Sequence, residues 1–282
     1  MRRILLFSIV FFALSLISSC DKIEPPYTQI VEEEPDDELT RKVLLEDYTG
    51  QRCVNCPAAA KVAHDIQELY GPKVVLMGIH TGFFALPGPP VFMLDLRTEA
   101  GEAWDKHFGI STAGHPKGII NRTSKGGVYF LSPGEWSTAT AAIIDDKADI
   151  KINLLTDYDE NSRQLNISVS STFLRTLGGA YTVQVCLVED SLVGTQFNND
   201  ATIGPAVIEN YVHRHVLRGA VNGIWGEHLT GESGAMVGAV IDKTYEMNLN
   251  ADWKAQHVSV VAWVQRASNL ELLQVEEVHI LP

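Results

Sequence analysis

The sequence predicts a mixed protein in which an α/β domain is followed by an all-β domain. Two observations support this fold class. From Arg41 to Asp149, strand-like segments alternate with segments whose apolar residues recur at helical spacing, as in a compact α/β domain. From Ile150 to Pro282, strand-like segments separated by Gly, Asn and Asp follow one another. A chain of 282 residues is long enough for two such domains.

The α/β region opens with the apolar run VLLEDY and continues with CPAAAKVAHDIQELYG, which has the spacing of a helix. The next run, KVVLMGIH, is typical of a strand that is buried on both faces. We expect a second helix over Thr98–His107 and a short strand over Gly127–Leu131. A last helix should follow, with Ser132 as its N-cap and Pro133 as its first residue.

In the all-β region, Leu165, Ile167 and Val169 alternate with polar residues, so one face of that strand should be buried. The strands and their spacing predict an antiparallel β-sandwich with the immunoglobulin-like architecture, although the Cys, Trp, Cys spacing of antibody domains is absent. The segments that favour strands are Ile150–Thr156, Leu165–Phe173, Tyr181–Glu189, Tyr211–Leu217, Val237–Leu249, Val258–Gln265 and Leu270–Ile280.

The N-terminus has the features of an export signal. Arg2 and Arg3 precede an apolar stretch, Ile4–Ile17, that is shorter than the roughly 20 residues needed to span a bilayer. Residues 1–19 therefore indicate a signal peptide rather than a membrane-spanning anchor. The stretch LISSC resembles the lipobox of bacterial lipoproteins, which is cut just before a cysteine that carries lipid. The resemblance implies that Cys20 is acylated and anchors the protein in a lipid bilayer.

Residues 20–40 have the composition of a solvated tether. Asp21–Glu38 contains three prolines and eight carboxylates against one lysine, without any hydrophobic period. This stretch holds more than half of the formal net charge of −13, so the acidity says little about the folded surface. Because no basic patch is present either, the sequence does not indicate binding to nucleic acid.

An exported protein can form disulfides, and acylation of Cys20 leaves Cys53, Cys56 and Cys186. The odd number leaves one thiol unpaired. Cys186 lies in the strand-like segment AYTVQVCLVED, where we expect a half-buried, unreactive side chain.

The pair in DYTGQRCVNCP can be a redox centre, half of a metal site or a structural staple. A closed zinc site needs four ligands, and no second pair of ligands follows at a plausible distance, so we expect neither a metal nor another cofactor there. Between a strand and a helix, the helix N-terminus stabilises a thiolate at the first cysteine. Cys53 would then attack a substrate disulfide and Cys56 would resolve the mixed disulfide, with Arg52 favouring the thiolate.

The segment VLLEDYTGQRCVNC resembles the strand, acidic residue and active-site cysteines of the thioredoxin superfamily. The resemblance implies that Asp47, six residues before Cys53, is a buried carboxyl that transfers protons. The segment GISTAGHP resembles the one that ends in the cis-proline of that superfamily, which implies a cis His115-Pro116 bond beside the disulfide.

Ordinary roles for these residues stay open, because Asp47 can simply end a strand and Pro116 can be a trans loop proline. The sequence also departs from the superfamily. Arg52 stands where many thioredoxins have tryptophan, and Val54-Asn55 lies between the cysteines. Since that dipeptide tunes the stability of the thiolate, the direction of the reaction does not follow from the sequence.

The segments TGQRCVNCP, IHTGFFA, RTEAGEAWDKHFGI, HPKGIINR and ENYVHRHVLRGAV, in this order, resemble the outer membrane protein twenty-eight family of Gram-negative lipoproteins. The resemblance implies a thioredoxin-like domain over residues 41–149, a β-sandwich over 150–282, and a lipid-anchored place in the cell envelope, at the outer membrane. We expect exchange with thiols or disulfides of envelope proteins at Cys53 and Cys56, with Pro116 and Asp47 in the site. The alternative is a surface adhesin in which the disulfide is structural.

Three further features each allow two interpretations. His213 and His215 alternate in YVHRHVL, so they should share a strand face within about 7 Å, as metal ligands or as packed surface residues. His80 ends a predicted strand, where it either helps to set the pKa of the cysteines or is satisfied within a loop. The insert Thr81–Leu94, rich in Pro, Gly and Phe, forms either a partner-binding lip or a cap on its own core.

Overall fold

The computed structural model describes residues 39–281. The expected signal peptide, Cys20 and the tether up to residue 38 lie outside these residues. Among the residues described, none of the helices is long and apolar enough to cross a membrane.

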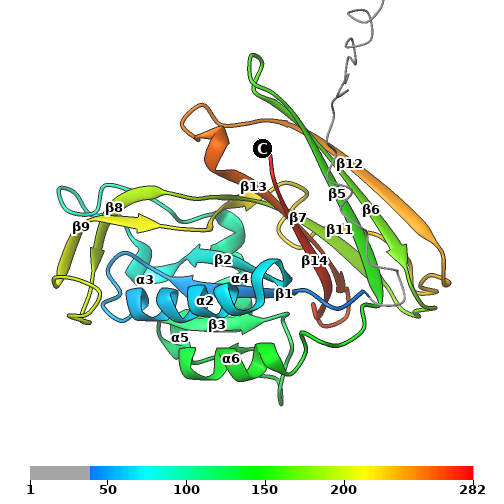
Figure 1. The fold of residues 1–282 in the computed structure, drawn as a ribbon, viewed down its shortest axis with the longest axis horizontal. Coiled ribbons are helices and arrows are strands. Elements are labelled where there is room, and N and C mark those ends of the chain that lie inside the picture. Colours follow the sequence, from blue (N-terminus) through cyan, green and yellow to red (C-terminus); the bar gives the residue numbers. More distant parts are fainter. Residues whose placement is uncertain (1–38, 282) are drawn as a thin grey trace, which may run out of the picture. The chain divides into compact units, whose positions relative to one another are not determined.

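A mixed sheet forms the centre of the described chain (Figure 1). Within residues 39–281 it has nine strands, in the order β14-β13-β7-β10-β2-β1-β3-β4, with β11 paired to β7. β1 and β2 are parallel, whereas β3 and β4 run antiparallel to their neighbours. The strands are β1 Val43–Thr49, β2 Val74–His80, β3 Lys117–Ile120, β4 Phe130–Leu131, β7 Tyr181–Glu189, β10 Val216–Ala220, β11 Glu227–His228, β13 Val258–Arg266 and β14 Leu272–His279.

Helices cover both faces of the β1–β4 part of this sheet. Ile66 of α2 and Trp136 of α6 pack in one buried cluster on one face, and Trp104 of α4 packs in another. The apolar run of β2 is therefore buried on both faces, as its sequence predicts. The helices are α2 Cys56–Tyr70, α3 Gly82–Ala85, α4 Glu99–Phe108, α5 Ile110–Ala113 and α6 Pro133–Ala141, with short 3₁₀ turns η2 Gly71–Lys73 and η3 Ala255–His257.

Side-chain caps fix where the helices begin. The hydroxyl of Thr98 accepts a hydrogen bond from the backbone N–H of Gly101 at 3.0 Å, so α4 begins one residue after Thr98. The backbone N–H of Ser132 donates to the carboxylate of Glu135 at 2.9 Å, which is half of a capping box. The expected N-cap at Ser132 and helix start at Pro133 are confirmed.

A second sheet packs against one end of the first. It has the order β12-β6-β5, and its strands are β5 Ile150–Asp159, β6 Gln164–Phe173 and β12 Val240–Asn248. Leu165, Ile167 and Val169 of β6 are buried, as expected from their alternation, in a core that they share with strands β7 and β13. The chain is therefore mixed α/β and built mostly of strands.

The two sequence regions meet in one sheet. We expected residues 41–149 and 150–282 to form separate domains, but β2 from the first region pairs with β10 from the second, with Val216 opposite Gly78. Strand β7, which continues the sheet, is buried along its whole length because layers cover both of its faces. Cys186 on β7 is accordingly fully buried rather than half-buried as expected.

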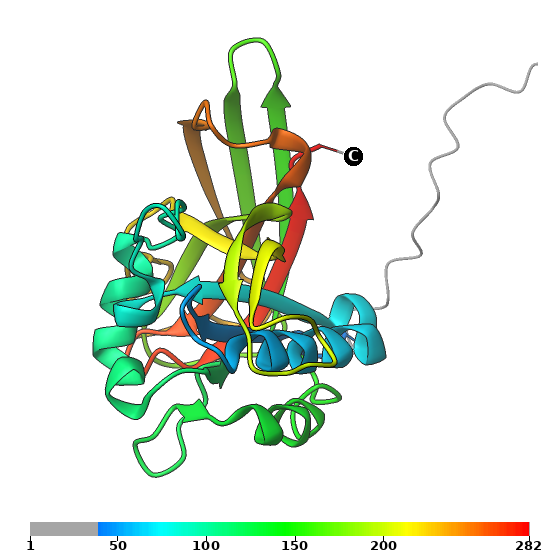
Figure 2. The ribbon, with the colours of Figure 1, turned by 90° about the vertical axis from the view of Figure 1, so that its left-hand side faces the viewer.

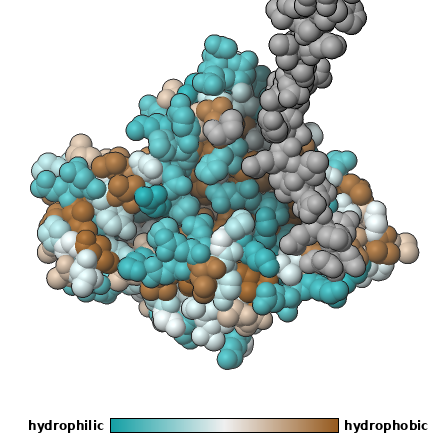
Figure 3. Space-filling view, viewed as in Figure 1, coloured by the Kyte–Doolittle hydropathy of each residue, from teal (hydrophilic) through white to brown (hydrophobic). Residues whose placement is uncertain are grey.

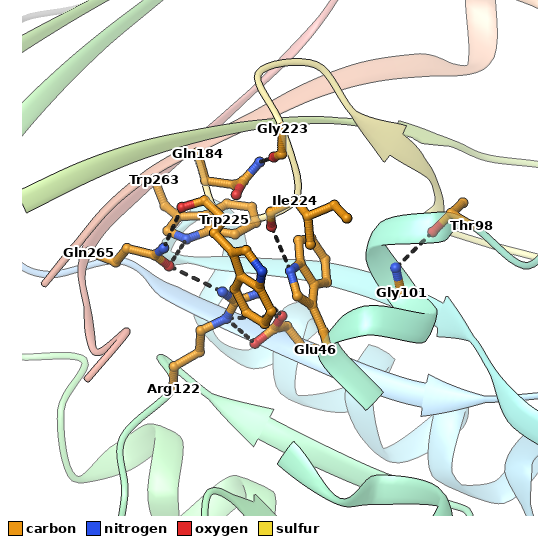
Figure 4. A network of polar contacts seen from close by, with 11 residues as sticks. Glu46, Thr98, Gly101, Arg122, Gln184, Gly223, Ile224, Trp225, Trp263 and Gln265 are labelled. Carbon is orange, nitrogen blue, oxygen red and sulfur yellow. Dashed lines mark hydrogen bonds and ion pairs between the residues drawn. The ribbon is translucent and has the colours of Figure 1, made fainter. Parts of the chain in front are cut away.

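A buried ion pair joins the two regions (Figure 4). The guanidinium of Arg122, which follows β3, donates two hydrogen bonds to the carboxylate of Glu46 on β1, at 2.7 and 3.0 Å, and both side chains are fully buried. It also donates to the side-chain oxygen of Gln265 on β13 at 3.1 Å and lies over the rings of Trp104 and Trp263. One guanidinium therefore links β1, α4 and β13.

Candidate functional site

Cys53 and Cys56 form a disulfide in the turn that connects β1 to α2. The backbone N–H of Cys53 donates to the carbonyl of Gly50 at 3.0 Å, and that of Cys56 donates to the carbonyl of Cys53 at 3.3 Å. These bonds bend the chain so that Cys56 becomes the first residue of α2. The pair thus lies at a helix N-terminus, where the helix dipole favours negative charge.

Both cysteines are only 2% exposed. A hairpin of β8, Leu192–Phe197, and β9, Val207–His213, covers the turn, and Figure 2 shows this yellow-green hairpin in front of the blue strand and turn. We call residues 192–213 the cover hairpin. The side-chain amide of Gln196, on β8, donates to the carbonyls of Gly50 at 3.2 Å and Cys53 at 3.0 Å. An attacking sulfur therefore has no open path to either cysteine.

Backbone hydrogen bonds continue the contact between the cover hairpin and the turn. The N–H of Phe197 donates to the carbonyl of Gln51 at 2.8 Å, and the N–H of Asn199 donates to the carbonyl of Val54 at 3.0 Å. The Asn199 side-chain amide also donates to the side-chain oxygen of Asn55. The hairpin also presents apolar surface, because Val193, Val207 and Val212 are exposed. Figure 3 shows that hydrophobic and hydrophilic residues are interspersed over this side of the molecule.

Arg52 holds the other side of the turn against the Phe-rich insert. Its backbone N–H donates to the carbonyl of Phe84 at 2.9 Å, and its guanidinium donates to the carbonyl of Pro87 at 2.8 Å and lies over the ring of Phe92. These contacts of Arg52 are with the insert, although we expected its charge to act on Cys53. Phe92 is buried whereas Phe83 is 66% exposed, so the insert both caps a core and presents apolar surface.

The His115-Pro116 bond is cis, as the sequence resemblance implies, and a second cis bond lies at Pro89-Pro90. The ring of His115 lies 5.6 Å from that of Phe84, and its Nε2 is 3.1 Å from the hydroxyl of Thr81. The carbonyl of Phe84 also accepts the hydrogen bond from the backbone N–H of Arg52 in the disulfide turn. The loop that contains His115 and the disulfide turn therefore both contact the short helix α3. Burial lowers the pKa of His115.

Asp47 lies inside the sheet, where β1 pairs with β2 and β3, opposite Gly78 and Gly118. Its Oδ1 is buried without a hydrogen-bond partner, and burial raises the pKa of its carboxyl to about 7. Burial, and after it the charge of Asp47, raises the pKa of the Tyr211 phenol to about 12. Asp47 is thus a buried carboxyl, as expected, and it does not end its strand, because β1 continues to Thr49.

A cavity of about 480 Å³ connects Asp47 with the surface beside α2. Pro57, the residue after Cys56, lines it together with Asp47, and Tyr211 belongs to the side formed by the cover hairpin. Most of its remaining wall is apolar. These other lining residues are Ala60, Lys61, Ala63, His64, Leu76, Met77, Gly78, Thr202, Ile203, Val212, Arg214 and His215.

The histidines are arranged differently from our expectation. His213 is buried on β9, but His215 lies outside the strand at a φ of 50°, so the two do not share one strand face. The ring of His213 instead contacts that of His80, at 5.2 Å between centroids. Burial lowers the pKa of His213 to about 4, and burial followed by the charge of His213 lowers the pKa of His80. Among residues 39–281, no group of three or more metal-ligating side chains is found.

Sequence reasoning placed Cys53, Cys56, Asp47 and Pro116 around one turn, but it missed Gln196, Asn199 and Tyr211. These residues come from a hairpin more than 140 positions further along the chain. Gln196 and Asn199 lie in LVGTQFNNDATIG, which contains no motif that links it to a cysteine pair. Tyr211 lies in YVHRHVL, where our expectation concerned only the two histidines.

A family model described as outer membrane protein Omp28 matches residues 102–282, which is more than half of the chain. The chain belongs to the Omp28 family. The description of the family agrees with the expected place in the cell envelope. The matched span includes Pro116 and the cover hairpin, whereas Asp47, Cys53 and Cys56 precede it.

Two solved structures from Porphyromonas gingivalis are similar to this Omp28 family member. HBP35 is 16% identical, with 86% of this chain and 76% of that chain covered, and its TM-score of 0.61 shows a likeness of fold. A domain of the outer membrane lipoprotein Omp28 is 27% identical over 47% of this chain and 88% of that one, with a TM-score of 0.32. No curated protein matches the chain.

Proposed function

We propose that this Omp28 family member carries out thiol-disulfide exchange with other envelope proteins at Cys53 and Cys56. The observation that carries the proposal is a disulfide at the first residue of a long helix, with the unpartnered carboxyl of Asp47 in an adjacent cavity. A disulfide that serves only as a staple needs neither feature. Acylated Cys20 would hold the protein on the bilayer.

We also propose a thioredoxin-like arrangement for the first region of the chain and an immunoglobulin-like arrangement for the second. The strand order β2-β1-β3-β4, with α2 after β1, α4 after β2 and α6 after β4, supports a thioredoxin-like arrangement for residues 41–149. The facing sheets formed largely by residues 150–282 support an immunoglobulin-like sandwich that shares strands with it.

From the oxidised state of the site, the reaction starts with a thiolate of a dithiol protein. This thiolate attacks the Sγ of Cys53, the Cys53–Cys56 bond breaks, and Cys56 leaves as a thiolate. The second substrate thiolate then attacks the substrate sulfur of the mixed disulfide and releases Cys53 as a thiolate. The substrate loses two electrons and two protons and becomes a disulfide, and the cysteine pair gains both electrons. The reverse sequence begins with attack by Cys53.

Asp47 would supply and remove the proton at Cys56. A carboxyl that titrates near neutral pH can give a proton to a departing thiolate and take one back under the same conditions. The cavity shared by Asp47 and Pro57 provides a path for exchange of that proton with solvent. Tyr211, which lines the same cavity, would stay protonated near Asp47, because burial and then the charge of Asp47 raise the pKa of its phenol to about 12.

A second candidate function is a binding or adhesive role in which the disulfide only holds the turn. The low exposure of both sulfurs and the hydrogen bonds from the cover hairpin favour this candidate. The two candidates differ in whether Cys53 ever becomes linked to another protein.

Trapping with Cys56→Ser in the native envelope tests the proposal. Without a resolving thiol, Cys53 should accumulate mixed disulfides that non-reducing electrophoresis separates and dithiothreitol reverses. The matched variant, Cys53→Ser, leaves a thiol in the same turn and should give far fewer adducts. Equal adducts from the two variants, or none from either, would favour the binding role.

A further inference from the structure

The cover hairpin has few sheet contacts that could hold it in place. In the described part of the chain, β8 and β9 pair only with each other, whereas the other main strands belong to sheets of three or more. Isolated two-stranded hairpins are marginally stable in water. The position of this hairpin therefore depends on what its residues contact across the chain.

The hydrogen bonds among those contacts go to the disulfide turn, whereas His213 adds a ring contact with His80. Gln196 is 2% exposed, and its amide group is directed at carbonyls of the turn, including that of Cys53 itself. Phe197 and Asn199 add two backbone hydrogen bonds to Gln51 and Val54. Further support comes from rings, because Phe197 packs on Phe92 at 4.8 Å between centroids. Separation of the hairpin from the turn would break the hydrogen bonds together.

The closed arrangement opposes exchange for two reasons. A sulfur nucleophile must approach the disulfide along the S–S axis, and the hairpin occupies the space over the turn. Burial also disfavours the charged thiolate that must form when the bond breaks. Exchange at this site thus requires a conformation in which the hairpin has moved.

We infer that the cover hairpin is a gate over Cys53–Cys56, and that Gln196 is the positioning residue which holds it closed. This inference rests on the proposed exchange function, and it adds that access, rather than bond chemistry, limits the rate. In the closed state the disulfide is protected from thiols of the envelope, and after opening it reacts as an exposed pair does.

Reduction of the full-length protein by increasing concentrations of dithiothreitol tests the gate. Acid quenching, alkylation and mass spectrometry give the rate at which the Cys53–Cys56 disulfide is lost. If opening comes first, the rate should level off at high dithiothreitol at the rate of opening. Gln196→Ala should raise this plateau about tenfold, because it removes hydrogen bonds made only in the closed state.

Two control variants separate gating from general loss of stability. Glu209→Gln changes an exposed side chain of β9, and it should leave the plateau within about twofold. Arg122→Met weakens the fold far from the hairpin and should not raise the plateau as Gln196→Ala does. If Gln196→Ala fails to fold, the exposed pair Asn55→Ala with Asn199→Ala replaces it, with a smaller rise expected.

The gate is refuted if the wild-type rate rises linearly with dithiothreitol, and if neither Gln196→Ala nor the double variant Asn55→Ala with Asn199→Ala changes this rate by more than about twofold. Exchange can still occur in that case, and mixing with a reduced dithiol peptide would show it. If the variants instead speed reduction by dithiothreitol but neither they nor the wild type oxidise the peptide, the gate is correct and the exchange function is wrong.

Discussion

Asp47 shows how a single buried carboxyl can couple the proposed chemistry to stability. Burial raises the pKa of its carboxyl from 3.8 to about 7, so the folded protein keeps a proton that the unfolded chain releases between these values. The contribution of Asp47 to stability should therefore fall as the pH rises from about 4 to about 7 and stay constant above that, with a total loss of about 4 kcal/mol.

We predict that Asp47→Asn removes this loss. The free energy of unfolding of the variant, from urea titration, should exceed that of the wild type by up to about 4 kcal/mol at pH 8 and by little at pH 4. The gain in stability will be smaller by the free-energy cost of any buried amide group that finds no hydrogen-bond partner. The difference between the two proteins cancels the opposite effect of His213, whose pKa is lowered to about 4 by burial and whose contribution to stability is lost as the pH falls below 6.5.

The matched control is Asp145→Asn, at an exposed position near the end of the same half of the chain. It should show no such dependence on pH. A difference between Asp47→Asn and wild type that is the same at pH 4 and pH 8 would contradict a neutral carboxyl at this position.

At the scale of elements, the sequence predicted the parts whose signals are local. Apolar spacing located α2, and the Ser132-Pro133 pair located the start of α6, because these signals depend on residues close together in the sequence. The alternation in β6 predicted its buried face for the same reason. The cysteine pair and the cis proline were predicted from short segments that resemble the thioredoxin superfamily.

The elements that were missed depend on distant partners. The expected strand Tyr211–Leu217 is two strands, β9 and β10, because His215 has a positive φ and the chain changes sheet at that point. Strand β8 was missed because only its pairing with β9 and its contact with the disulfide turn give it a fixed place. A single sequence does not encode which turn a distant hairpin covers, so the burial of the cysteines was not foreseen.

At the scale of the molecule, one sheet and one buried ion pair combine regions that composition had separated. Near residue 149 the sequence changes from alternating strand-like and helix-like segments to strand-like segments alone. The hydrogen bonds between β2 and β10 cross this boundary, because strand pairing does not depend on that pattern. Glu46, Arg122 and Gln265 then connect strands from both regions through charged and polar groups that have no access to water. This arrangement should make unfolding of the described region cooperative.

We predict that urea unfolds residues 39–281 in a single transition and that Arg122→Met shifts the whole of it. Removing one partner from a buried pair costs about 3–5 kcal/mol, because the Glu46 carboxylate is left without its partner. The control, Arg175→Met, breaks the ion pair between Arg175, 64% exposed, and Asp149, and should cost less than about 1 kcal/mol. Two transitions, of which Arg122→Met moves only one, would contradict the shared sheet.

The most direct test of the proposed function follows sulfur in the full-length protein. A reduced dithiol peptide is mixed with the oxidised protein, and mass spectrometry of alkylated samples measures both partners over time. We predict that the peptide disulfide appears in step with loss of the Cys53–Cys56 disulfide, that Cys186 stays unmodified, and that Gln196→Ala accelerates the exchange. A peptide that remains fully reduced with both the wild type and Gln196→Ala, while Cys53–Cys56 stays intact, would show that the disulfide is structural.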